Sequence, residues 1–313
     1  YASSSERRES RFGKSMNEIG EIYLKRIREA FPNLEIKTIR NNSDGLTNGV
    51  FIVNEDLVFR FPKNETWALE LLANEIKVIK LLRNLVEIPL PQIELAAEDL
   101  SVHRFIRGKP LCRHDVLKLN EKEKTKIAEQ LSVFLKQMHN VPMKEVKRHG
   151  IGNSDTNRSR EVWLKLYENA QKELFPLMLP DVREMTDAHF ASIVADESFM
   201  NHKACLMNGD FVPPHILYDE TKRKVVGIID FGTAGTGDAA GDFACVVYNY
   251  GESFLKRMTR VYPEIRENID RARFWAGTLE LQWALSGVRT KNVWWHLVSM
   301  SGASDAQPIG TGF

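Results

Sequence analysis

The sequence predicts an α+β protein with two lobes, a small antiparallel β-rich N-lobe followed by a larger, mostly helical C-lobe. Between about residues 35 and 107, runs rich in Val, Ile and Phe alternate with polar turns, which is typical of β-hairpins. From about residue 120 onward, apolar residues recur mostly at helical spacing. We therefore place the N-lobe at residues 16–104 and the C-lobe at residues 105–313.

The composition is that of an ordinary globular protein and excludes several classes of partner. The 313 residues are 43% hydrophobic and 27% charged, and they are enough to bury two cores. The 43 basic and 42 acidic residues nearly cancel, which argues against a nucleic-acid-binding surface. No apolar run is long enough to cross a bilayer, so we expect no membrane partner. The widely spaced cysteines indicate reduced, buried thiols of a cytoplasmic protein rather than a disulfide framework or zinc site: Cys112, Cys205 and Cys245.

Residues 1–15 are rich in Ser, Arg and Glu and have no apolar periodicity. They lack the apolar core of a secretory signal. We interpret them as a disordered arm or a cloning remnant, with the natural start at Met16.

The N-lobe elements follow from short-range patterns. A helix begins at Met16, and an amphipathic helix spans Trp67 to Leu85. Strands are expected near residues 35–40, 49–54 and 56–61, with a further pair in about 92–107. A tight turn at Asn54 and Glu55 joins the second and third strands.

The C-lobe is predicted to hold several helices and one hairpin. The helices are expected at residues 121–141, 160–175, 189–199, 241–262 and 268–288. Two short apolar strands interrupt them between residues 206 and 230. A cleft between two lobes is where a small-molecule site is expected.

Two aspartates flank the predicted hairpin. Asp210 lies in the polar turn "NGDFVPPH", and Asp230 ends the apolar run "VVGIID". A hairpin brings its two ends together, so both carboxylates and His215 can face one point. Such a cluster can hold a divalent cation and orient a hydroxyl, and oxygen donors suit Mg²⁺.

Other interpretations of this cluster are open from spacing alone. Aspartate before Phe or Gly is common in turns, and Asp219 in the same hairpin is interpreted as a turn residue. Asp230 is different, because an acid directly after a buried strand is costly if it has no partner. The bare pair of acids also fits a metal-dependent phosphohydrolase, although the order of the two lobes argues against one.

The stretches "NGDFVPPHILYD" and "GIIDFGTAGTGDAAGDFA" resemble the catalytic loop and the metal-binding segment of the aminoglycoside phosphotransferase family. The resemblance covers nearly all of the chain after Met16 in the family's order, and it is strongest to the 2''-aminoglycoside branch. It implies a protein-kinase-like fold. Asn208 stands where the family usually has His, and His215 stands where Asn is commoner.

The resemblance also implies roles in the C-lobe. Asp210 matches the catalytic aspartate that orients the proton of the attacking hydroxyl, and Asp230 matches the Mg²⁺ ligand. His215 matches the second metal position. Asp242 is expected to cap the helix that it begins, and its family counterpart braces the catalytic loop.

In the N-lobe the resemblance implies a nucleotide site. Its loop holds Ser43, Gly45 and Asn48, and Arg60 is the expected phosphate-binding cation, paired with Glu75. The segment "SVHRFIRGKPL" resembles the hinge, where backbone groups of Val102, His103 and Arg104 would hold the purine of ATP or GTP.

The function implied by the resemblance is transfer of the γ-phosphoryl group of ATP or GTP to a hydroxyl of an aminoglycoside, by a monomer. Carboxylates are the residues expected to hold a polycationic acceptor, and the candidates are Asp210, Asp238, Glu252, Glu280 and Asp305. One alternative keeps the kinase but makes the acceptor a macrolide or a metabolite of the choline or homoserine type. Another is a nucleotide-binding module without turnover, which the departures at Asn208 and His215 would favour.

Overall fold

The computed structural model describes residues 16–42, 47–63, 66–291 and 309. The chain divides into two compact units, one of Tyr1–Lys63 and Glu94–Phe105 and the other of Asn64–Ile93 and Ile106–Phe313. This division differs from a boundary after residue 104, because helix α2 (Thr66–Leu82) groups with the larger unit. Its side chains Val78, Ile79 and Leu82 join the core of that unit. The division into functional lobes stays a prediction.

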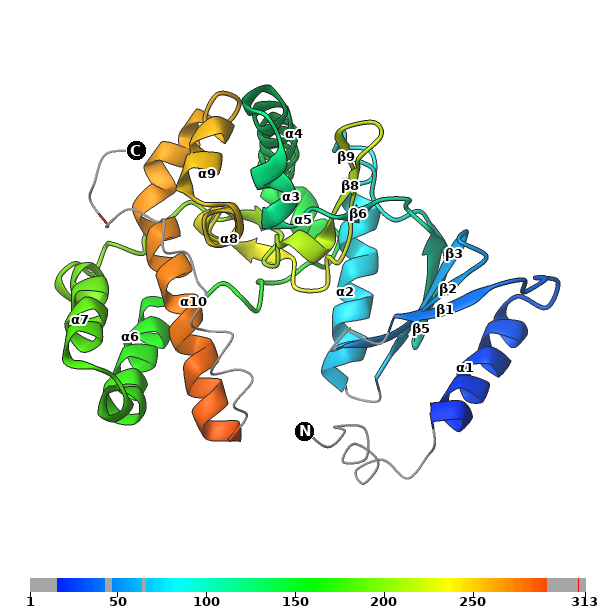
Figure 1. Ribbon diagram of the computed structural model, residues 1–313, viewed down its shortest axis with the longest axis horizontal. Helices are drawn as coiled ribbons and strands as arrows, with labels where there is room; N and C mark the ends of the chain where they lie inside the picture. The colour runs from blue at the N-terminus through cyan, green and yellow to red at the C-terminus, as the bar shows by residue number, and fades with distance from the viewer. Residues whose placement is uncertain (1–15, 43–46, 64–65, 292–308, 310–313) are drawn as a thin grey trace. The chain divides into compact units, whose positions relative to one another are not determined.

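The smaller unit is a five-stranded sheet with one helix packed on it (Figure 1). The strand order is β1-β2-β3-β5-β4. The strands are β1 (Ile39–Asn42), β2 (Asn48–Val53), β3 (Leu57–Pro62), β4 (Ile93–Ala97) and β5 (Leu100–Arg104). Helix α1 (Met16–Ala30) buries Ile27 against this sheet, and its Tyr23 ring lies 4.9 Å from the rings of both Phe51 and Phe61.

The predicted turn at Asn54 and Glu55 is present, and both residues have left-handed backbones with φ of 56° and 51°. The strand expected near residues 35–40 is β1, and it begins only at Ile39. The residues before it form hydrogen bonds with the Asn54 side chain instead of with a neighbouring strand. Asn54 Oδ1 accepts hydrogen bonds from the amides of Lys37 and Thr38, and its Nδ2 donates to the carbonyl of Glu35.

The larger unit surrounds one hydrophobic core with helices and two small sheets. Its remaining helices are α3 (Arg113–Lys118), α4 (Glu121–His139), α5 (Met143–Arg148), α6 (Arg160–Asn169), α7 (Pro180–Ala195), α8 (Ala240–Tyr250), α9 (Glu252–Met258) and α10 (Ile269–Thr290). Short helical turns are η1 (Ala170–Leu174), η2 (Phe175–Leu177), η3 (Pro213–His215) and η4 (Pro263–Asn268). The sheets are β6 (Lys109–Pro110), β8 (Ile216–Asp219) and β9 (Lys224–Ile228), and β7 (Cys205–Met207) with β10 (Gly235–Gly237).

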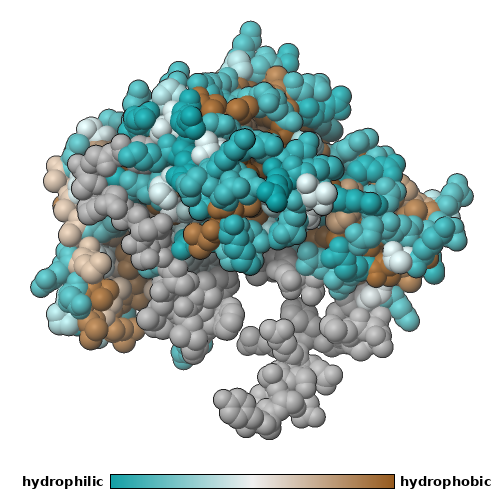
Figure 2. Space-filling model, turned by 45° about the horizontal axis from the view of Figure 1, so that its top comes forward, coloured by the Kyte–Doolittle hydropathy of each residue, from teal (hydrophilic) through white to brown (hydrophobic). Residues whose placement is uncertain are grey.

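Two helix predictions in this unit were wrong. The helix expected at residues 241–262 is two helices, because Gly251 between them adopts φ of 85°, which a helix cannot include. The helix expected at residues 189–199 begins at Pro180, whose fixed φ suits a first turn, and ends by Asp196. No helix of the described residues is long and apolar enough to cross a bilayer. The face in Figure 2 is mainly hydrophilic, with apolar residues in small separate groups.

Candidate active site

The loop after β7 and the segment that follows β9 carry the predicted catalytic groups. The β8–β9 hairpin joins them, with Ile216 paired to Ile228. His215 lies between the two carboxylates, with Nδ1 3.5 Å from Asp210 Oδ2 and Nε2 3.6 Å from Asp230 Oδ2. The hairpin therefore brings the three predicted residues to one point.

The imidazole of His215 is oriented by the backbone. Its Nδ1 lies 3.0 Å from the carbonyl oxygen of Asp210, which only accepts, so Nδ1 carries the proton. In the neutral ring, Nε2 then presents a lone pair toward the carboxylate of Asp230. A histidine whose Nδ1–H donates to a carbonyl can offer Nε2 to a metal ion, and a carboxylate beside Nε2 could bind the same ion. The donor set of His215 and Asp230 thus fits a divalent cation.

Both carboxylates remain reachable by solvent, because the side chains of Asp210 and Asp230 are 44% and 36% exposed. Partial burial is the main cause that raises the pKa of Asp210; a protonated His215 opposes the rise, and the charge of Asp230 adds to it. A raised pKa makes Asp210 a better proton acceptor. Asp230 has a left-handed backbone with φ of 64°, which an aspartate adopts only when its surroundings hold it there.

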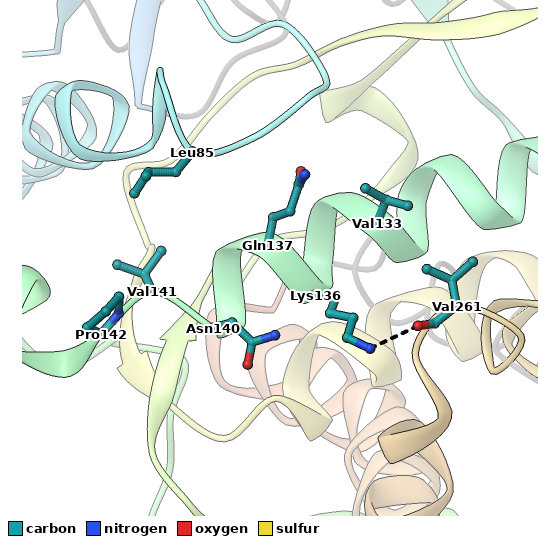
Figure 3. Close-up of a pocket in the computed structure, with 8 residues that line it drawn as sticks. All are labelled: Leu85, Val133, Lys136, Gln137, Asn140, Val141, Pro142 and Val261. Carbon is teal, nitrogen blue, oxygen red and sulfur yellow. Dashed lines mark hydrogen bonds between the residues drawn. The ribbon is translucent and has the colours of Figure 1, made fainter.

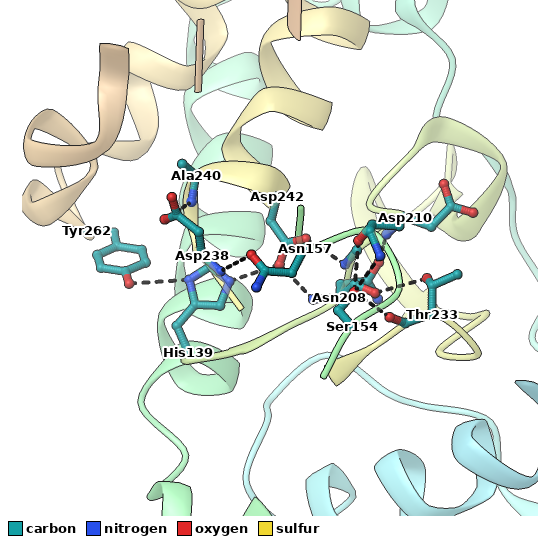
Figure 4. Close-up of polar contacts among 12 residues, drawn as sticks. His139, Ser154, Asn157, Asn208, Asp210, Thr233, Asp238, Ala240, Asp242 and Tyr262 are labelled. Atoms are coloured by element: carbon teal, nitrogen blue, oxygen red, sulfur yellow. Dashed lines mark hydrogen bonds and ion pairs between the residues drawn. The ribbon is translucent and has the colours of Figure 1, made fainter. Parts of the chain in front are cut away.

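Asp242 braces the catalytic loop from inside the larger unit (Figure 4). Its carboxylate accepts hydrogen bonds of 2.8 Å from the amides of Asn208 and Gly209, and it lies 2.9 Å from Nε2 of His139. The His139 ring continues to the hydroxyl of Tyr262 at 3.3 Å. The expected cap at the start of the helix was wrong, because α8 begins two residues earlier at Ala240. The bracing implied by the resemblance is what the carboxylate does.

Gly209 is required by this loop. Its φ is 80°, and a Cβ at this position would come within 2.6 Å of Thr156 Oγ1 and 2.9 Å of Ser154 Oγ. The Ser154 hydroxyl donates to the carbonyl of Thr233, which ties the segment after Asp230 to the same place. Asn208 Oδ1 accepts from the Asp210 amide at 3.0 Å, so Asn208 shapes the turn that presents Asp210.

Of the residues predicted to bind nucleotide that the structure describes, all except Glu75 lie on the smaller unit. Ser43 and Gly45 lie outside the described residues. Asn48 is buried on β2, Arg60 on β3 is paired in register with Ser101 of β5, and Val102 and His103 are buried on β5. Arg104 is exposed, and its guanidinium pairs with Asp56 and Glu94. Glu75 is 3% exposed on α2 of the other unit, so its ion pair with Arg60 stays a prediction.

A family model described as "Phosphotransferase enzyme family" matches residues 38–275, which is most of the chain. The chain belongs to this phosphotransferase family. Viomycin phosphotransferase of Streptomyces vinaceus is 26% identical over 155 residues, 49% of this chain and 51% of that protein. The match with that protein therefore spans only about half of its length.

Solved structures of the family share the fold. The GDP and kanamycin complex of APH(2'')-IIia has a TM-score of 0.79 at 23% identity and covers 89% of this chain and 96% of that one. The macrolide 2'-phosphotransferase MphH from Brachybacterium faecium has a TM-score of 0.66 at 19% identity, covering 93% and 99%. These similarities confirm the protein-kinase-like α+β fold.

Helix α2 of the phosphotransferase is tied to the segment that follows Asp230. Asn74 Nδ2 donates to the carbonyls of Gly232 at 2.8 Å and Ala234 at 2.7 Å. The Cβ of Leu71 lies 3.2 Å from where a Cβ on Gly232 would stand. Asn74 therefore helps to hold the strained backbone of Asp230. The sequence offered no signal for this residue, since its partners lie about 160 positions further along the chain.

Replacing Asn74 by leucine is expected to raise the Mg²⁺ concentration for half-maximal turnover about tenfold, which corresponds to about 1.4 kcal/mol. The variant keeps the side-chain volume but leaves two carbonyls without a donor. Mn²⁺ binding in the presence of ADP measures the same effect without turnover. Lys77→Met is the matched control, because Lys77 lies one turn further along α2 and donates to Gly150 instead. An equal shift in both variants would contradict a specific role of Asn74.

His103 makes the smaller unit sensitive to acid. Burial is the main cause that lowers the pKa of His103 to about 4; the hydrogen bond to the carbonyl of Arg104 opposes this shift, and the nearby charge of Arg60 contributes to it. In the unfolded chain this histidine takes up its proton near pH 6.5. Between pH 6.5 and pH 4 the unfolded state therefore holds more protons than the folded state, and stability decreases as the pH is lowered. We expect about 3 kcal/mol of the free energy of unfolding to be lost from this group between pH 7 and pH 4.

Urea unfolding at several pH values, followed by circular dichroism, tests this expectation. The His103→Phe variant should show a shallower decline than the wild type between pH 7 and pH 4. His149→Asn serves as the control, since His149 lies at the end of α5 in the larger unit. Parallel curves for wild type and His103→Phe would contradict the prediction.

The acids predicted to bind a cationic acceptor differ in burial and in the partners they already have. Asp238 is buried, and its carboxylate accepts from the guanidinium of Arg271 at 2.6 Å and from the amide of Ala240 at 3.0 Å. Glu280 is half-buried on α10. Burial, and then the charge of Glu280, raises the pKa of Tyr248. A substrate contact of either acid stays a prediction, and Asp305 lies outside the described residues.

A surface hollow of about 360 Å³ lies at the end of α4 (Figure 3). Lys136, Val141 and Val261 are among its lining residues, and none of the predicted site residues lines it. The candidate active site is therefore identified by the positions of Asp210, His215 and Asp230, and this hollow is not part of it.

Proposed function

We propose that this phosphotransferase moves the γ-phosphoryl group of ATP or GTP to a hydroxyl of an aminoglycoside, as a monomer in the cytoplasm. The observation that carries the reaction is the position of His215 between the carboxylates of Asp210 and Asp230. One carboxylate serves the acceptor and the other serves the metal.

Asp210 accepts the proton of the acceptor hydroxyl as its oxygen attacks the γ-phosphorus. Its raised pKa and its exposure both suit this task. Asp230 and His215 are the residues that would hold Mg²⁺, which neutralises the phosphate oxygens when it is bound. Asn208 and Gly209 keep Asp210 in position through Asp242.

The nucleotide-binding assignments in the smaller unit are part of the proposal. We assign the phosphates to Arg60 and the loop of Ser43, Gly45 and Asn48, and the purine to backbone groups of residues 102–104. Asn48 supports this, because its buried Oδ1 accepts no hydrogen bond from the described residues. A buried acceptor of this kind is costly unless a further donor reaches it.

One observation favours a less cationic acceptor as the second candidate. Two of the acids suggested for a polycation already have arginine partners on α10, since Asp238 pairs with Arg271 and Glu252 with Arg273. Glu252 and Asp238 are buried in these pairs. Fewer free carboxylates would suit a macrolide, which needs apolar surface more than charge.

Nucleotide turnover with each class of acceptor tests the proposal. ATP and GTP would each be combined with kanamycin, gentamicin, a macrolide and choline, and release of nucleoside diphosphate would be measured. Stimulation by kanamycin or gentamicin that disappears in Asp210→Ala supports the aminoglycoside assignment. Stimulation only by the macrolide supports the second candidate, and nucleotide binding without any stimulation would contradict both.

A further inference from the structure

A mixed cluster of metal-binding side chains lies outside the candidate active site. The cluster lies at the start of α3. Cys112 is the residue before the helix, and His114 and Asp115 lie in its first turn. One donor atom from each residue lies within 4.8 Å of the other two. In the part of the chain that the structure describes, no other group of three such donors meets this spacing.

We propose that Cys112, His114 and Asp115 form a binding site for a borderline divalent cation of the Zn²⁺ type. A thiolate, an imidazole and a carboxylate are the three donor classes that Zn²⁺ takes in proteins. Two nitrogen or oxygen ligands about 2.1 Å from a tetrahedral ion lie about 3.4 Å apart. His114 Nε2 and Asp115 Oδ1 are 3.4 Å apart. The sulfur completes the third position, and water the fourth.

The backbone of this site is held in place from both sides. Arg113 donates to the carbonyls of Tyr248 and Asn249 at the end of α8, and the amide of Asp115 donates to the carbonyl of Cys112. The His114 side chain, which is 68% exposed, must become ordered when the ion binds, and Lys109 must leave Asp115. A site with two fixed ligands and one mobile ligand loses little conformational entropy on binding.

The chemistry of the thiols distinguishes Cys112 from the other cysteines. Burial raises the pKa of both the Cys205 and the Cys245 thiols, which keeps them protonated and unavailable as ligands. All three cysteines were expected to be buried; Cys205 is buried, but Cys112 and Cys245 are only half-buried. The S–H proton of Cys112 passes to the solvent as the metal–sulfur bond forms.

Lys109 is the competitor for this site. Its ammonium group donates to Asp115 Oδ1 at 2.8 Å and lies 2.6 Å from Glu220 Oε1. Lys109 therefore occupies the carboxylate oxygen that the metal ion would take. When the ion takes Asp115, Glu220 remains as the partner of Lys109. Removing Lys109 should therefore strengthen metal binding. If Asp115 only formed an ion pair and bound no metal, removing Lys109 would have no such effect.

Titration of the metal-free protein with Co²⁺ tests the site directly. A thiolate bound to Co²⁺ gives a charge-transfer absorption band in the near ultraviolet, and carboxylates and histidines do not. The band therefore distinguishes this site from Asp210, His215 and Asp230. We expect one equivalent of Co²⁺ to saturate the band and Zn²⁺ to abolish it.

Variants decide which residues bind. Cys112→Ser should remove the band, while Cys245→Ser should keep it. Asp115→Asn and His114→Gln should each weaken binding at least tenfold, and Lys109→Met should tighten it severalfold. The proposal is overturned if no band forms at a large excess of Co²⁺, or if the band survives in Cys112→Ser. It is also overturned if the Asp115 and His114 variants bind as well as the wild type, because the sulfur would then act alone.

Discussion

Replacing Asp210 by asparagine is expected to lower acceptor-dependent phosphoryl transfer about a thousandfold, within the range that a positioned general base contributes. Asparagine keeps the shape of the side chain but cannot accept the proton of the attacking hydroxyl. Steady-state kinetics with the acceptor that stimulates the wild type measures the loss in kcat. Nucleotide affinity, measured by calorimetry, should stay within about threefold because Asp210 serves the acceptor.

The matched control is Asp219→Asn in the same hairpin. The carboxylate of Asp219 accepts from the amide of Lys222 in the turn between β8 and β9, so its loss should leave turnover within about twofold. A thousandfold loss in both variants would indicate damage to the hairpin rather than to the chemistry. An unchanged rate in Asp210→Asn would contradict the proposed mechanism.

Replacing Asp242 by alanine is expected to lower the free energy of unfolding by about 3–5 kcal/mol, the typical cost of removing one partner from a buried ionic cluster. The substitution leaves the amides of Asn208 and Gly209 and the ring of His139 without their acceptor. Turnover of the folded fraction should fall as well, because the loop that presents Asp210 loses its brace. Urea unfolding and kinetics on the same samples measure both effects.

Asp242→Asn keeps the volume and one acceptor oxygen, so it provides a second test if the alanine variant does not fold. We expect it to lose about half as much stability, since one amide retains a partner. Glu173→Gln is the control, because the pair of Glu173 with Arg289 lies at the surface and should contribute little to stability. Equal losses in the Asp242 and Glu173 variants would contradict the bracing role.

Much of the fold could be predicted because the patterns that specify it are local. Alternating apolar runs and the turn at Asn54 and Glu55 predicted the hairpin of β2 and β3, and the structure confirms the turn. Helical periodicity predicted α2, α4 and α10 to within a few residues. The two failures, at Gly251 and Pro180, arose where one residue changed the backbone within an otherwise apolar segment.

The candidate site was predictable to the same extent. Asp210, His215 and Asp230 could be placed together because one hairpin joins them, and a hairpin is a short-range structure. The partners of Asp238 could not be predicted in the same way. Arg271 lies 33 positions away, and only packing of α10 brings it to the carboxylate. The carbonyls that accept from Asn74, and the contact between His139 and Asp242, likewise depend on packing of distant segments.

The sequence by itself determined the two-lobed α+β architecture, the family and the identity of the acids at the ends of the β8–β9 hairpin. These depend on periodicity and on motifs a few residues long. The tertiary structure alone decided which carboxylates are free and which already have a partner. Asp242 lies behind the catalytic loop, Asp238 is paired with Arg271, and Asp210 remains exposed. The physical reason is that the state of a charged side chain depends on burial and on groups within a few ångströms, and distant segments supply both.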